Sequence, residues 1–224
     1  MADKGGAFAQ RRCDMILMDA SPLIYLAKAS CLGLLLHFSA RIFMADEVYF
    51  EAAGRWFGPD PAPQRSGTPP ADASDIARFI AEHADNFQIV PTQLGTMLAQ
   101  QRRAGLAPKI DNAGEMAAAS VYDRRRELTG DRLPVLLIFE DTEIPLRFAQ
   151  RDVHLLSTYG LLLAMELTGH LPSAQEAFER IPAGERPSNG RRTLPPTNPC
   201  TATASTGRSS NLGADKHRSL FWSG

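Results

Sequence analysis

The chain has 224 residues, of which 44% are hydrophobic and 22% are charged, and this composition is typical of a soluble globular protein with a hydrophobic core. Its formal net charge of −1 excludes nucleic-acid binding through a strongly basic overall charge, so contacts with RNA would have to use local basic patches. Three cysteines without metal-site spacing argue against a disulfide framework and favour a reducing, cytoplasmic setting.

Charged residues also argue against a membrane segment or an export signal. The apolar run that starts at Met15 is interrupted by Asp19 and again by Lys28. The run is therefore too short and too polar to cross a membrane, and we expect no membrane partner.

Short apolar runs alternate with helical patterns along the chain. The runs predict strands at 15–18, 41–44, 87–90, 134–139 and 153–156. Helices are predicted at 22–36 with a joint at Gly33, and at 46–56, 72–85, 92–104, 112–128, 142–150, 158–168 and 173–181. This alternation predicts a three-layer α/β/α fold around a parallel sheet of about four or five strands.

Polar residues mark the expected helix starts. Ser21 is the expected N-cap of the first helix, with Pro22 at its first position. Asn112 and Glu115 have the spacing of a capping box, in which each side chain binds the backbone of the other. Further N-caps are expected at Asp46, Thr92 and Ser173.

Two of the predicted strands end in acidic residues. Asp19 follows the first strand, and Glu140-Asp141 follows the fourth. Because the carboxyl ends of parallel strands share one edge of a sheet, Asp19 and Asp141 are expected to lie together there. Glu115 lies near a helix start, where the helix dipole favours a negative charge, and Glu51 is the fourth candidate. Carboxylate oxygens select hard cations, so the predicted ligand is Mg²⁺ or Mn²⁺.

Each of these acids also has a purely structural interpretation. Asp19 can be a turn residue, and Asp141 can be the N-cap of the next helix. Glu115 can serve only as a capping partner, and Glu51 can be a solvated helix residue. Other acids lie nearby, and their default roles are at the surface or as caps: Asp46, Glu47, Asp111, Glu140 and Glu143. Spacing alone therefore indicates an acidic site without identifying its members.

Basic residues form two local clusters, Arg102-Arg103 and Arg124-Arg125-Arg126. They are interpreted either as solvated helix faces or as groups that contact phosphates outside a cleft. The histidines have no paired zinc spacing and are interpreted as structural.

Three stretches together resemble PIN-domain proteins. MDASPLIYLAKASCLGLLLHFSARIFMADEVYFEA is similar to the start of that family, and IDNAGEMAAASVY is similar to its D-x-G-E-x-x-A-x-x-A segment. VLLIFEDTEIPLRFAQRDVHLLSTYGLLLAMELTGHL resembles its closing strand-acid-helix-strand-helix unit. The resemblance covers 15–181 as one PIN-like nuclease domain, with an atypically long middle at 54–107. Residues 185–224 are rich in Pro, Ser, Thr, Gly and Arg, and are predicted to be a disordered tail.

The resemblance implies a metal-dependent endoribonuclease with an acidic catalytic site. By position, Asp19 and Glu115 would hold Mg²⁺ or Mn²⁺, Asp141 would complete the ligand set or position the water, and Glu51 would act at the rim. RNA is the implied substrate. Many members of the family are toxins of toxin–antitoxin pairs, so a cognate antitoxin protein and a homodimer are implied partners.

Two departures from the family pattern keep other functions open. Ser157-Thr158 stands where the family often has Gly-Thr, and Glu143 and Pro145 occupy positions where small or basic residues are common. The alternative is therefore a catalytically weak PIN-like module that binds RNA or a protein. A metal-dependent phosphatase or DNA nuclease that uses the same acids is a further alternative.

Overall fold

The computed structural model describes residues 13, 15–57, 68–130, 135–140, 148 and 151–186. Within these residues, five strands form one all-parallel sheet in the order β3-β2-β1-β4-β5. The strands are β1 (Met15–Met18), β2 (Arg41–Ala45), β3 (Phe87–Val90), β4 (Val135–Phe139) and β5 (Val153–Ser157). The predicted parallel sheet is therefore confirmed.

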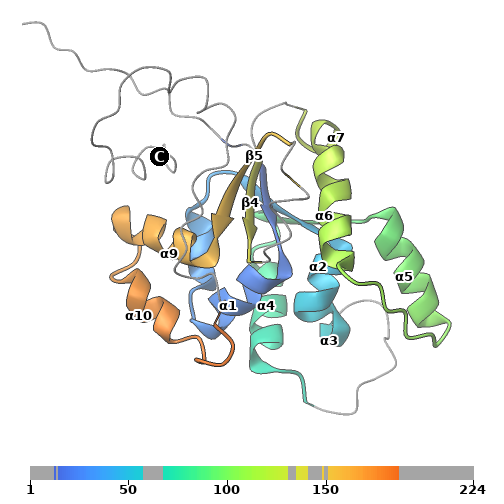
Figure 1. The fold of residues 1–224 in the computed structure, drawn as a ribbon, viewed down its shortest axis with the longest axis horizontal. Helices are drawn as coiled ribbons and strands as arrows, with labels where there is room; N and C mark the ends of the chain where they lie inside the picture. Colours follow the sequence, from blue (N-terminus) through green and yellow to red (C-terminus); the bar gives the residue numbers. More distant parts are fainter. Residues whose placement is uncertain are drawn as a thin grey trace, which may run out of the picture.

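Helices cover both faces of this sheet, as Figure 1 shows. On one side lie α1 (Ala20–Lys28), α4 (Ala71–Glu82), α9 (Thr158–Leu167) and α10 (Ala174–Glu179). On the other side lie α5 (Gln93–Arg103), α6 (Ala113–Asp123) and α7 (Arg125–Thr129). This arrangement confirms the predicted three-layer α/β/α fold. None of the helices in the described residues is long and apolar enough to cross a membrane.

A continuous helical stretch follows β2 and joins the two helical layers. It consists of α2 (Asp46–Tyr49), the π-helix η2 (Phe50–Gly54) and α3 (Arg55–Phe57). Its α2 part contacts α6, and its η2 part contacts α1 and α4. The stretch therefore holds residues from both layers in a fixed relation at the edge where the strands end.

The central strands owe their position to their composition. Every residue of β1 and β4 is buried, whereas the edge strands β3 and β5 are only partly buried. A strand covered on both faces by helices can be apolar at every position, because no side chain points to water. This explains why MILM and VLLIF predicted strands correctly although they lack alternation.

The first helix begins earlier than predicted. Ala20 is already helical, and Asp19 holds the N-cap position without a capping hydrogen bond from its side chain. The prediction of Ser21 as the N-cap was wrong, because β1 runs directly into α1. Pro22 is tolerated in the first turn since its missing N–H has no partner to lose there.

The segment predicted at 22–36 is two helices. The second is a 3₁₀ helix, η1 (Leu32–His37). The break lies at Ser30, which has a positive φ of 55°, and not at Gly33, which lies inside η1. Cys31 and its neighbours therefore form the joint.

Of the other predicted helix N-caps, some are confirmed by the structure and some are wrong. Thr92 and Ser173 are N-caps, and their hydroxyl oxygens accept bonds from the amides of Gly95 and Glu176. Ala45, and not Asp46, holds the N-cap position of α2. The capping box at Asn112 does not form, because the backbone of this residue has the left-handed conformation and its side chain makes no capping hydrogen bond.

Asp46 has a different structural role from the predicted one. Its carboxylate accepts bonds from the amide and the hydroxyl of Thr92, at 2.9 and 2.8 Å. Gly95 lies so close that an added Cβ would come within 2.1 Å of Asp46 Oδ2. The acid therefore links α2 to the start of α5, a contact across 46 residues of sequence.

Several predictions concern residues that lie outside the described part of the chain. These are the candidate site residue Asp141, the helix at 142–150 apart from Phe148, and the tail beyond Arg186.

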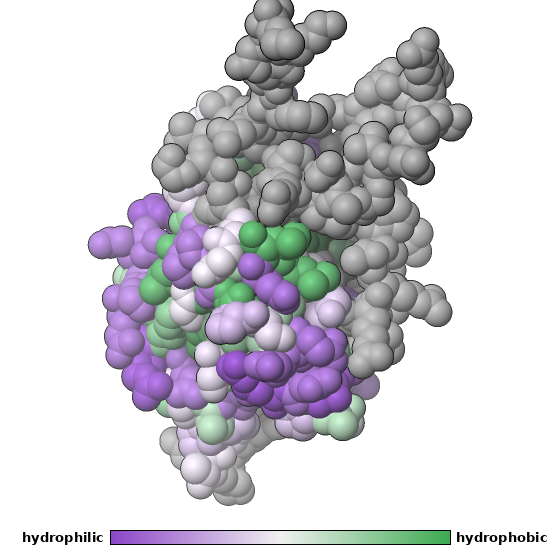
Figure 2. All heavy atoms as spheres, turned by 90° about the vertical axis from the view of Figure 1, so that its left-hand side faces the viewer, coloured by the Kyte–Doolittle hydropathy of each residue, from purple (hydrophilic) through white to green (hydrophobic). Residues whose placement is uncertain are grey.

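One face of the molecule carries exposed apolar groups. Figure 2 shows an apolar area, bordered by hydrophilic side chains, on the side where α9 and α10 lie in Figure 1. Leu167 of α9 is 51% exposed.

The rings of His37 and His170 stack with their centroids 3.9 Å apart, so the end of η1 lies against the end of α9.

A buried ion pair fixes α5 against the stretch that carries Glu51. Two nitrogens of Arg102 donate to the two carboxylate oxygens of Glu47, at 2.9 and 2.5 Å. Glu47 is only 3% exposed, and the guanidinium of Arg102 lies 3.5 Å from the centre of the Phe50 ring. The pair is therefore shielded from water on both sides.

We expect Arg102→Ala to lower the free energy of unfolding by about 3 kcal/mol, because it leaves the buried charge of Glu47 without its partner. Urea unfolding at neutral pH measures this loss. The control is Gln100→Ala on the same helix, whose exposed side chain should cost only about 0.5 kcal/mol. Equal losses in the two variants would contradict this role of Arg102.

Candidate functional site

The strand order identifies the place in the sheet where a ligand is most readily bound. From β1 the chain moves to β2 and β3 on one side, and it then returns to β4 and β5 on the other side. The order therefore reverses between β1 and β4. In open parallel sheets, ligands bind beyond the carboxyl ends of the strands at such a reversal.

Two acids flank this reversal. Asp19 follows β1 directly and is 7% exposed, and its amide donates to the carbonyl of Ile138 in β4 at 3.0 Å. Glu140 follows β4 directly. Both acids lie within electrostatic reach of Tyr25 on α1: burial raises the pKa of this phenol most, and the charges of Glu140 and Asp19 raise it further.

Glu140 is held at the start of α9. Its Oε1 accepts a hydrogen bond from the amide of Thr158, the first residue of that helix. Its Oε2 is buried, and the Thr158 hydroxyl, which is also buried, lies beside the carboxylate. Burial raises the pKa of Glu140, and the hydroxyl and amide of Thr158 oppose this rise.

Sequence reasoning assigned Glu140 only a surface or capping role and chose Asp141 instead. The structure shows that Glu140 does accept a helix-start amide, but that its carboxylate is largely buried beside the reversal. One signal was present in the sequence, since Glu140 follows its apolar strand immediately, as Asp19 does. Asp141 lies outside the described residues.

The other two candidate acids, Glu115 and Glu51, meet the start of α6 in different ways. Glu115 is the third residue of this helix and is 6% exposed. The carboxylate of Glu51 reaches from η2 to Gly114, whose amide donates a hydrogen bond to it. An added Cβ at Gly114 would lie 2.9 Å from Glu51 Oε2, so the absence of a side chain allows this close approach. The positive end of the α6 dipole favours both carboxylates.

The groups around Glu51 have opposing effects on its pKa. The residue as a whole is exposed, but its carboxylate end packs against α6. Burial of that end raises the pKa of Glu51, and the charge of Glu47 adds to the rise. Arg55, the Gly114 amide and Arg102 lower it.

The π-helical turn explains how Glu51 reaches this position. Glu47 and Glu51 are four residues apart, a spacing that places two side chains on the same side of a regular α-helix. In the structure they diverge, because Glu47 pairs with Arg102 while Glu51, inside η2, contacts Gly114. Such wide turns occur frequently at functional sites.

The donor chemistry of these acids fits a hard divalent cation. All candidates are carboxylates, and carboxylate oxygens are ligands that such cations prefer. The described residues nevertheless contain no group of three His, Cys, Asp or Glu side chains close enough to hold one metal ion. Two pairs of neighbours can be named instead. Asp19 and Glu140 both lie within electrostatic reach of Tyr25, and Glu51 contacts Gly114, the residue that precedes Glu115.

The arginine clusters are engaged within the protein. Arg102 pairs with Glu47, and Arg124 donates to Glu127 and to the carbonyl of Pro91. Arg125 lies over the ring of Tyr122 at 4.2 Å. Arg102 is therefore not on a solvated helix face as one interpretation expected, and Arg102, Arg124 and Arg125 are each engaged by other groups of the protein.

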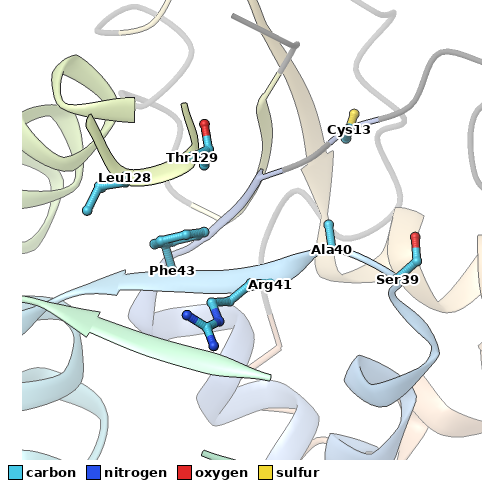
Figure 3. A pocket seen from close by; sticks show the side chains of 7 residues that line it. All are labelled: Cys13, Ser39, Ala40, Arg41, Phe43, Leu128 and Thr129. Atoms are coloured by element: carbon cyan, nitrogen blue, oxygen red, sulfur yellow. The ribbon is translucent and has the colours of Figure 1, made fainter. Parts of the chain in front are cut away.

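A hollow of about 450 Å³ lies elsewhere, as Figure 3 shows. Its lining includes Cys13 before β1, Arg41 at the start of β2, and Thr129 at the end of α7. These residues lie at the amino ends of the parallel strands. The hollow is therefore at the opposite edge of the sheet from the acids, and it is not part of the candidate site.

Comparisons with known proteins found no matching protein-family model, no matching curated protein and no matching solved structure. The functional interpretation therefore depends on the position and chemistry of the residues described above.

We expect the metal-free protein to lose stability as Glu51 ionises. Burial holds its folded pKa above the ordinary value of 4.5, so the folded state binds this proton more tightly than the unfolded chain. The stabilisation is full below about pH 4.5 and is lost as the pH rises through the higher folded pKa. Glu51→Gln should remove this loss.

Urea unfolding between about pH 4 and about pH 7 in EDTA measures the effect. The free energy of unfolding of the Glu51→Gln variant should fall less over this range than that of the wild type. Glu82→Gln, at an exposed position on α4, should follow the wild type. Parallel curves for Glu51→Gln and the wild type would contradict the inferred burial of this carboxylate.

Proposed function

We propose that this protein is a Mg²⁺- or Mn²⁺-dependent endoribonuclease that hydrolyses RNA phosphodiesters at the acidic edge of its sheet. The observation that carries the proposal is the position of Asp19, a buried carboxylate at the carboxyl end of β1, where the strand order reverses. The resemblance of three sequence stretches to PIN-domain proteins supports the same function.

The charges of the site explain why a cation is required. An RNA phosphate that approaches these carboxylates alone meets only like charge, which disfavours binding. Under the proposal, Asp19 and Glu115 hold the cation and Asp141 completes the ligand set. The bound cation supplies the positive charge that activates water and stabilises the phosphate in the transition state.

The chain holds its own residues in place for this chemistry. The backbone bond from Asp19 to Ile138 fixes this acid at the junction of β1 and α1. The contact of Glu51 with Gly114 places the rim carboxylate at the start of α6, next to Glu115. Glu51 is positioned to orient a substrate or a proton at the rim rather than to bind the cation.

The family resemblance also supports a biological role. We propose that the protein acts in the cytoplasm, as the toxin of a toxin–antitoxin pair. A small antitoxin protein would hold it inactive, and the working unit would be a homodimer.

Two observations favour a second function. No three acidic or other metal-binding side chains gather closely in the described residues. In addition, Ser157 stands where PIN-domain proteins often have glycine, and its hydroxyl is used to cap α9 by accepting a bond from Gly160. A catalytically weak module that binds RNA or a protein is therefore the second candidate.

We expect Asp19→Asn and Glu115→Gln each to lower the rate of RNA cleavage by at least about 100-fold, because each loses a charged oxygen ligand at the reacting centre. The assay is cleavage of a mixed panel of labelled RNAs with Mn²⁺, Mg²⁺ or EDTA. Glu127→Gln is the control, because it removes an exposed glutamate that pairs only at the surface with Arg124. Melting temperatures show that each variant is folded.

The same panel separates the two candidate functions. Metal-dependent cleavage that survives both substitutions would contradict the assigned acids. RNA binding in EDTA, without cleavage in either metal, would support the binding module in place of the nuclease.

A further inference from the structure

We infer that Arg55 and Phe57 of α3 bind the substrate beside the acidic edge, Arg55 through an RNA phosphate and Phe57 by stacking on a base. The inference rests on the proposed function, which supplies RNA as the substrate. Both residues lie in the atypically long middle of the chain, beyond the stretch that resembles the start of PIN-domain proteins. They are therefore a feature of this chain and not part of the acidic site.

The position of α3 places both residues next to that site. The helix continues directly from η2, which carries Glu51, and it packs against η2 and α4. Figure 1 shows α3 beside α2, beyond the carboxyl ends of the strands. An RNA chain bound at the acids extends past them in both directions, so its neighbouring nucleotides reach α3.

Arg55 is exposed and lies close to the rim acid. Its guanidinium is 5.7 Å from the centre of the Phe50 ring. Burial raises the pKa of Glu51, and the charge of Arg55 opposes this rise, so the two side chains are within electrostatic reach of each other. Arg102, which lies over the same ring, is in contrast only 11% exposed and is paired with Glu47.

The charge of Arg55 suits a phosphate of the substrate. Carboxylates at the sheet edge repel the RNA backbone, and a positive charge beside them offsets this repulsion. The planar guanidinium of arginine also donates two parallel hydrogen bonds to one phosphate. Because Arg124 and Arg125 are engaged by other groups of the protein, the phosphate contact is assigned to Arg55 rather than to that cluster.

Phe57 supplies an exposed ring next to this charge. It is 44% exposed, whereas the other phenylalanines of the described residues are buried or only partly exposed. Single apolar side chains at the surface are common, so the ring alone would indicate nothing. Its position two residues from an exposed arginine is informative, because proteins hold unpaired nucleotides with positive groups on the phosphates and aromatic rings on the bases.

The test measures the affinity of the full chain for a panel of labelled, unpaired RNA oligonucleotides by fluorescence anisotropy. EDTA is present so that metal-dependent cleavage does not occur. We expect Arg55→Gln and Phe57→Leu each to weaken binding by roughly 5-fold or more. Phe57→Tyr keeps an aromatic ring and should bind like the wild type.

The salt dependence of binding separates the two contacts. Loss of one phosphate contact in Arg55→Gln should lower the slope of log affinity against log salt by about 0.7. Phe57→Leu should leave this slope unchanged, because stacking releases no counterion. An unchanged slope in Arg55→Gln would overturn the phosphate contact.

The control variants remove matched groups at distant positions. Arg126→Ala removes an exposed arginine from α7, at the other end of the molecule in Figure 1, and Leu167→Ala removes an exposed apolar side chain from α9. Both should bind RNA like the wild type. Losses in these controls equal to those in the α3 variants would overturn a contact specific to α3.

Melting temperatures in the same buffer show whether each variant is folded. Both α3 changes are at exposed positions, so the variants should melt like the wild type. If either variant does not fold, Arg55→Met or Phe57→Ile replaces it, with the same expected loss of affinity.

The outcomes distinguish this inference from the proposed function. Wild-type affinity in the folded α3 variants, with cleavage lost in Asp19→Asn, would overturn the two contacts and leave the nuclease proposal standing. Weakened binding in both α3 variants, without cleavage by the wild type in either metal, would support the contacts and contradict the nuclease. A wild-type protein that binds none of the oligonucleotides would overturn the inference.

Discussion

The parallel pairing of β1 with β4 is the constraint on which the candidate site depends. These two strands are buried along their whole length, so their register is fixed by packing on both faces. The β1–β4 ladder ends with the bond from the Asp19 amide to the Ile138 carbonyl, and β4 ends one residue later at Phe139. A shift of one residue in either strand would turn each of its side chains to the opposite face of the sheet and move Asp19 relative to the end of β4.

A second set of contacts positions the acids on the other side of the edge. The helical stretch from α2 to α3 is fixed to α5 by the pair of Glu47 with Arg102 and by the bonds of Asp46 with Thr92. Its π-helical turn then directs Glu51 to the start of α6. The two sides of the site are therefore positioned by different parts of the core, and this stretch, which contacts both helical layers, connects them.

The sequence was sufficient for the strands and most helices, because burial on two faces leaves a continuous apolar run that local pattern analysis can detect. It was insufficient where a distant residue competes for a side chain. Aspartate is a residue type that commonly caps helices, but the carboxylate of Asp46 accepts hydrogen bonds from Thr92 instead. Asp19 and Glu115 are buried in the structure, whereas the local pattern left open whether they were only a turn residue and a capping partner. The burial of the Glu140 carboxylate depends on its bond with the amide of Thr158, 18 residues away in sequence, which no local pattern encodes.

The most direct measurement of the central claim is a crystal structure of the protein grown with MnCl₂, with anomalous diffraction recorded near the manganese absorption edge. The account predicts an anomalous peak at the carboxyl edge of the sheet, within coordination distance of the carboxylate oxygens of Asp19 and Glu115. Ordered side chains at that edge without a peak, or a peak only at another part of the molecule, would contradict a metal-dependent site at the reversal between β1 and β4.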